Sequence, residues 1–96
     1  MDLLILLEIS KRPFISGYDM IVAFQKRFNL FISPGTIYLT LYTLEREGLI
    51  RGEDRRKRVY ILASKGEKFI EEALAFQENI KLILSKILRN NYPKLL

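Results

Sequence analysis

The chain has 96 residues and a net charge of +5, from 16 Lys and Arg against 11 Asp and Glu. This length suits one small domain, and at this size a lone monomer is only marginally stable. The chain contains no Cys and no His, which excludes zinc fingers, disulfides, thiol nucleophiles and Ser/His triads. No cluster of carboxylates, Lys or Tyr suggests catalysis, so we expect a protein that is not an enzyme and has neither metal nor cofactor.

The apolar segments are too short to cross a membrane. The longest uninterrupted apolar run is residues 3–7, whereas a span needs about 20 residues. The first ten residues lack the basic region and the small-residue cleavage site of a signal peptide. We therefore expect a cytoplasmic protein without a membrane partner.

Two helices are expected before residue 30. Residues 3–9 are rich in Leu and Ile and apolar all round, which predicts a helix buried on more than one side. Ser16 and Asp19 match a capping box, and apolar residues then recur at helical spacing to about Phe28.

A third helix is expected over residues 34–47. Ser33 is a good N-cap, Pro34 suits the first helical position, and Gly48 suits a left-handed terminator. The helical period places Ile37, Leu41 and Leu44 on one face, which we assign to the core. The opposite face contains Gly35, Thr36, Leu39, Thr43 and Arg46, with Tyr38 and Thr40 on its flanks.

A small β-hairpin follows the third helix. Residues 49–51 and 59–62 have strand-like composition and flank a polar turn. The basic segment, residues 51–58 (RGEDRRKR), has five basic and two acidic residues and so contributes +3 of the +5 net charge. A basic surface gains affinity for polyanions through counterion release, although a charge run is also typical of a solvated loop.

A long helix is expected over residues 65–90, with Ser64 and Glu67 as a capping box and Pro93 beyond its end. Apolar residues alternate along it by four and three, which is a heptad pattern. This heptad seam consists of Phe69, Ala73, Phe76, Ile80, Ile83 and Ile87. A second row widens it through Ile70, Leu74, Leu84 and Leu88. A body of about 60 residues is too small to cover both rows, so we expect a partner helix; the alternative is a helix packed only within its own chain.

The order of elements is typical of a winged helix-turn-helix. The predicted fold is mainly α with a small β-hairpin: a winged helix-turn-helix DNA-binding domain over residues 1–64 and a C-terminal dimerisation helix over residues 65–96. In such units the third helix lies in the major groove, and the hairpin forms a wing beside it.

The stretch over residues 33–50 resembles the signature of the PadR family of winged-helix transcriptional regulators. Residues 16–19, residues 60–62 and Gly66 are also similar to that family's pattern. The resemblance implies a homodimer that binds operator DNA, usually as a repressor, and that pairs through the C-terminal helix with packing by the first. The chain departs from the pattern at Leu39, where the family commonly has Pro, and at Ala63, where it has Thr.

These considerations select two sets of residues. The candidate DNA contacts are Ser33, Gly35, Thr36, Tyr38, Thr40 and Thr43 on the third helix, with Arg55, Arg56, Lys57 and Arg58 on the wing. The candidate dimer interface is Leu3, Leu6 and the heptad seam. Tyr42 and Arg46 fit either a plain surface or a contact with the DNA backbone.

Other interpretations of the same features stay open. A winged helix also serves as a protein–protein interaction module, and the C-terminal helix is a weaker candidate for binding a membrane surface. Phe69 and Phe76 are candidates to line a small-molecule effector pocket, although Phe at heptad positions more often belongs to packed core. Short family members that bind flat aromatic drugs use Trp at the dimer interface, and this chain has no Trp.

Overall fold

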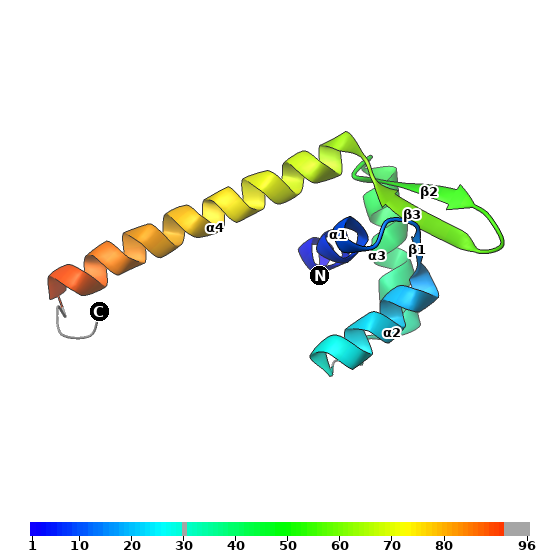
Figure 1. Cartoon of the computed structure of the whole chain (residues 1–96), viewed down its shortest axis with the longest axis horizontal. Coiled ribbons are helices and arrows are strands. Elements are labelled where there is room, and N and C mark those ends of the chain that lie inside the picture. The colour runs from blue at the N-terminus through cyan, green and yellow to red at the C-terminus, as the bar shows by residue number, and fades with distance from the viewer. Residues whose placement is uncertain (30, 92–96) are drawn as a thin grey trace.

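The computed structural model describes residues 1–29 and 31–91 and contains four helices and three strands in that part of the chain (Figure 1). In chain order they are α1 (Asp2–Lys11), β1 (Ile15–Ser16), α2 (Gly17–Phe28), α3 (Pro34–Arg46), β2 (Ile50–Asp54), β3 (Arg58–Leu62) and α4 (Ser64–Asn91). The first three helices and the sheet gather at one end, and α4 extends away from them as a single long helix. The predicted fold class is confirmed. Pro93, which was expected just beyond the end of the last helix, lies outside the described residues.

Three of the predicted helix ends have the expected chemistry. The Ser16 hydroxyl accepts a hydrogen bond of 3.1 Å from the Asp19 amide at the start of α2. The Ser33 hydroxyl accepts one of 3.3 Å from the Thr36 amide at the start of α3. Gly48 follows α3 with a φ of 80°, a conformation that glycine adopts at little cost.

The predicted capping box at the start of α4 is wrong. The helix begins at Ser64, so this residue lies inside the helix rather than before it. The carbonyl of Ala63 accepts hydrogen bonds from the amides of Gly66 and Glu67 at 2.9 and 3.1 Å. The backbone of Ala63 therefore begins the helix without a side-chain cap.

The sheet is antiparallel with strand order β1-β3-β2. The wing, which we define as the hairpin of β2 and β3 over residues 50–62, pairs Ile50 with Leu62 and Asp54 with Arg58. The sequence predicted this hairpin but not the full length of β2, which continues through Gly52 to Asp54. It also did not predict β1, whose two residues join the edge of β3, with Ile15 opposite Tyr60.

The core lies where α1, α2 and α3 meet the sheet. Three residues of α3, Ile37, Leu41 and Leu44, are fully buried as predicted. They pack in one cluster with Ile5, Leu6, Ile9, Ile15, Met20, Phe24, Leu49, Ile50, Tyr60 and Ile70. Within the described residues, no helix combines the length and the hydropathy that crossing a membrane requires.

The burial of Leu6 corrects one interface assignment. Leu6 was expected to contact a partner chain, but its side chain is 0% exposed within its own core. Because the face of α1 that contains Leu6 is already covered, only the half-buried Leu3 of these two predicted residues remains available to a partner.

Two leucines of α3 test this division between core and surface. We expect Leu41→Ala to lower the free energy of unfolding by about 2–5 kcal/mol, because it leaves a cavity. Leu39→Ala, on the exposed side of the same helix, should change it by less than about 0.5 kcal/mol. Urea unfolding followed by circular dichroism measures both values, and equal losses would contradict the assignment.

Candidate nucleic-acid interface

The outer face of α3, which we define as Gly35, Thr36, Tyr38, Leu39, Tyr42 and Arg46, is uncovered. Tyr38, Leu39 and Tyr42 are 49%, 67% and 63% exposed. Ser33 is exposed just before the helix, whereas Thr40 and Thr43 are half-buried at the flanks. All six predicted contact residues of this helix therefore lie at or beside one solvent-facing surface.

The hydroxyl groups on this helix bond to the chain itself. Thr40 donates to the carbonyl of Thr36 at 2.8 Å, and Thr43 donates to the carbonyl of Leu39 at 2.9 Å. The hydroxyls of Ser33 and Thr36 lie 2.8 Å apart and share one hydrogen bond. Because the hydroxyl hydrogens of Thr40 and Thr43 are donated to these carbonyls, the two side chains offer a ligand only oxygen lone pairs and a methyl group.

The ring of Tyr38 is held against the start of α2. It occupies the space beside Gly17, where an added Cβ would lie 2.5 Å from the Tyr38 Cε1 atom. The missing side chain of Gly17 thus lets the ring pack there, while half of its surface stays exposed. This contact orients Tyr38 on the outer face.

The basic residues of the wing are mostly engaged in ion pairs. Arg55 lies 3.2 Å from Glu53, and its guanidinium sits 4.2 Å from the centre of the Phe14 ring. Lys57 reaches Asp19 of α2 at 3.3 Å. Arg56 is exposed and forms no ion pair within residues 1–29 and 31–91. The four predicted phosphate contacts are therefore not equivalent.

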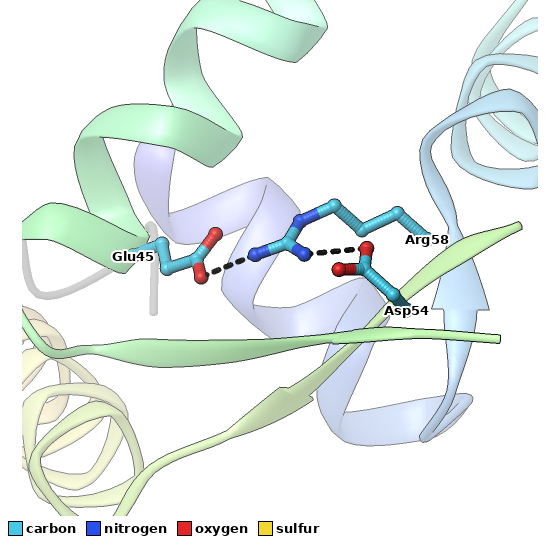
Figure 2. A network of polar contacts seen from close by, with 3 residues as sticks. All are labelled: Glu45, Asp54 and Arg58. Carbon is cyan, nitrogen blue, oxygen red and sulfur yellow. Dashed lines mark hydrogen bonds and ion pairs between the residues drawn. The ribbon is translucent and has the colours of Figure 1, made fainter.

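Arg58 begins β3 beside the turn of the wing, and its side chain links the wing to α3 (Figure 2). Its guanidinium contacts Glu45 of α3 at 2.6 Å and Asp54 of β2 at 2.7 Å. The hydrogen bond to Asp54 raises the pKa of Arg58, as does the charge of Glu45, so this group stays protonated. Gly52 makes room for it, because a Cβ there would lie 2.6 Å from an Arg58 nitrogen.

Asp19 holds Lys57 over a wide pH range. The hydrogen bond with the Ser16 hydroxyl lowers the pKa of Asp19 below its ordinary value, and the nearby Lys57 lowers it further. A lowered pKa means that the carboxylate remains charged at and above its ordinary pKa. Stability from this contact is lost only as the pH falls through the lowered value.

A shallow cleft of about 320 Å³ lies between α3 and the wing. It is lined by Tyr42, Glu45, Arg46 and Arg58. Leu39 and Glu45 had no predicted role in the site, and Tyr42 and Arg46 were left undecided. The available sequence signal for Leu39 was its place, as an apolar residue, on the face opposite the core. No sequence signal pairs Glu45 with Arg58.

The heptad seam on α4 is largely uncovered by its own chain. Ala73 is half-buried and the other members are 41–67% exposed. In the second row, Leu74, Leu84 and Leu88 are also exposed, and only Ile70 is buried in the core. Intramolecular packing therefore leaves both apolar rows exposed along most of the helix.

The described residues contain no cluster of side chains suited to hold a metal ion.

Comparison with known proteins gives a consistent assignment. The model of the transcriptional regulator PadR-like family matches residues 5–72, more than half of the chain. A solved PadR family transcription regulator from hypervirulent Clostridium difficile is 26% identical, with a TM-score of 0.72 over 91% of this chain and 96% of that chain. A winged-helix DNA-binding protein from STIV is 28% identical, with a TM-score of 0.68 over 82% and 86%.

A PadR-like transcriptional regulator from Bacillus cereus is 29% identical, with a TM-score of 0.65. That match covers 76% of this chain but 44% of the other, so the chain spans less than half of that regulator. No curated protein matches the chain significantly.

The contact between Glu45 and Arg58 can be tested directly. We expect Glu45→Gln to leave the thermal midpoint almost unchanged, because exposed ion pairs contribute little to global stability. Amide hydrogen exchange across residues 52–58 should rise several-fold, because the wing loses its link to α3. Glu53→Gln, which removes a carboxylate from the same hairpin, is the control and should leave exchange across residues 52–58 almost unchanged. Equal exchange in both variants would contradict the linking role.

Proposed function

Because the chain belongs to the PadR-like family of transcriptional regulators, we propose that it represses transcription as a homodimer bound to double-stranded operator DNA. The observation that carries the DNA contact is the continuity of two surfaces. The uncovered outer face of α3 and the basic wing meet at the cleft that Tyr42, Arg46 and Arg58 line. In winged helix-turn-helix proteins, these are the surfaces that meet the major groove and the phosphates.

In this proposal α3 enters the major groove with its N-terminal half nearest the bases. Ser33 and Gly35 lie at the helix N-terminus, where backbone amides and the helix dipole favour a phosphate. Thr36 and Tyr38, with Thr40 and Thr43 on the flanks, face the base edges. Contacts with phosphates position the protein, and contacts with base edges discriminate between sequences.

The wing contacts phosphates in two ways. Arg56 can bind a phosphate without giving up a protein partner in the described part of the chain. Arg55, Lys57 and Arg58 exchange a carboxylate for a phosphate or share their donors between the two. The net gain in affinity from these three residues is therefore smaller than their charge suggests.

The homodimer is supported by the exposed apolar rows of α4. An apolar stripe that continues over several helical turns marks an interaction surface, because it is costly to leave in water. Its heptad spacing fits another helix of the same kind. A two-fold pair would present two copies of α3 to half-sites about 34–36 Å apart, or a multiple of that distance. Repression is the role that the family resemblance implies.

Salt dependence tests the wing. We expect Arg56→Ala to weaken binding to all duplexes alike and to lower the slope of log K against log salt by about one unit for each wing in contact. Lys81→Ala, which removes an exposed charge from α4, is the control and should leave the slope unchanged. Fluorescence anisotropy with a random duplex over a series of salt concentrations gives both slopes. Identical slopes in the two variants would count against the wing contact.

Charge placed in the heptad seam tests the dimer. We expect Ile80→Lys combined with Ile83→Lys to give monomers, because two ammonium groups would have to be buried between the helices. Glu78→Lys combined with Ser85→Lys adds at least as much positive charge on the opposite side of α4 and should remain dimeric. Sedimentation velocity distinguishes the two states. A dimer in the first variant would remove the seam from the interface.

A further inference from the structure

We propose that α3 discriminates between bases chiefly through apolar contact with the C5-methyl groups of thymine, and that Leu39 is the main specificity-determining residue. This inference rests on the proposed DNA-binding function and deepens it by naming what the helix recognises. Thymine is the one base that presents a methyl group in the major groove.

The outer face of α3 is unusually apolar for a helix surface in water. Leu39 is 67% exposed at its centre, and Tyr42 is 63% exposed three residues later, which places the two side chains on neighbouring turns of the same side. Neither belongs to the core cluster. The exposed Leu39 thus has no packing role within the described part of the chain. For this reason the free energy of unfolding is predicted to change little on Leu39→Ala.

The hydrogen-bonding groups of the helix point to the same chemistry. Residues 33–44 contain no Arg, Lys, Asn or Gln, the side chains that make paired hydrogen bonds to guanine or adenine. The hydroxyl hydrogens of Thr40 and Thr43 are bonded to backbone carbonyls of α3. These threonines retain a methyl group and an acceptor oxygen for a partner, and the exposed Tyr38 and Tyr42 offer single hydroxyls that cannot make paired hydrogen bonds to a base. We therefore infer that apolar contact is the main means of discrimination in the first three turns.

The surroundings of this apolar surface favour DNA over a protein partner. Arg46 of α3 and Arg58 of β3 line the cleft beside Tyr42, and the basic segment with its +3 charge is continuous with Arg58. A polyanion satisfies these cations while its groove covers the apolar side chains. A protein that docks here is the competing outcome in the experiment below.

The experiment begins with selection of bound sequences from a random duplex library of about 30 base pairs, at low salt. The expected product contains fixed thymines in each half-site. The selected duplex is then synthesised with uracil in place of each fixed thymine in turn, which removes the methyl group and keeps every hydrogen-bonding group. Binding should weaken by about fourfold at each contacted position, the value for one buried methyl-sized group.

The variants assign the effect to a residue. Leu39→Ala should reduce the discrimination between thymine and uracil to under about twofold at the position that Leu39 contacts. Arg56→Ala is the matched control: it should weaken binding to both duplexes equally and keep the full fourfold difference, because phosphates are the same in both. Circular dichroism checks that both variants are folded.

Each other outcome overturns the inference in a distinct way. Equal affinity for the thymine and uracil duplexes would overturn thymine recognition while leaving the proposed DNA-binding function in place. Full discrimination by Leu39→Ala would remove Leu39 from the contact. Failure of the protein to bind any duplex at about 50 mM salt, where non-specific binding is strong, would overturn both this inference and the proposed function, in favour of a protein partner.

Discussion

The burial of one stripe of α3 determines what the molecule can present to a partner. Ile37, Leu41 and Leu44 are fully buried among residues of α1, α2 and the sheet. Because a helix turns by about 100° per residue, fixing these three inward sends Leu39 and Tyr42 outward. The same packing brings Glu45 within reach of Arg58, and so sets the wing against the helix that it accompanies. Rotating α3 by one position would expose core leucines and break this link.

The internal ion pairs make the wing less basic in effect than its composition implies. Asp19, Glu45, Glu53 and Asp54 all lie within 3.3 Å of a wing cation. Each pair is exposed enough for solvent to screen it, so a phosphate can replace the carboxylate at modest cost. The carboxylates hold the cations in defined positions, and in the proposed complex they would lower the affinity for DNA of arbitrary sequence. A regulator benefits from this balance, because weak non-specific binding leaves more of the discrimination to the bases.

Local features of the fold could be predicted from the sequence, and contacts between distant segments could not. The caps at Ser16 and Ser33 depend on residues three positions apart, and the buried stripe of α3 follows from helical period alone. Strand β1 was not predicted because two residues are too few to show an alternating pattern. Its residue Ile15 pairs with Tyr60, which lies 45 positions later in the chain. The pairing of Lys57 with Asp19 spans 38 residues for the same reason. Leu6 was misassigned because a helix that is apolar all round does not indicate which side its own core covers.

Two exposed apolar surfaces of the described residues, on α3 and on α4, differ in shape and surroundings in the way that the two proposed partners require. On α4 the exposed rows follow a heptad over several turns, with charges of both signs around them, which fits the equally apolar and nearly neutral helix of a second copy. On α3 the exposed surface is only about one turn long and lies beside Arg46 and Arg58. A surface that small cannot bury enough area to hold a protein by apolar contact alone, since stable interfaces cover about 800 Å² on each side. In the proposed complex, Arg46 and Arg58 lie next to phosphates, so the polyanion would supply most of the affinity. A few methyl contacts would then be sufficient, because the apolar side chains would need to supply only the choice of base.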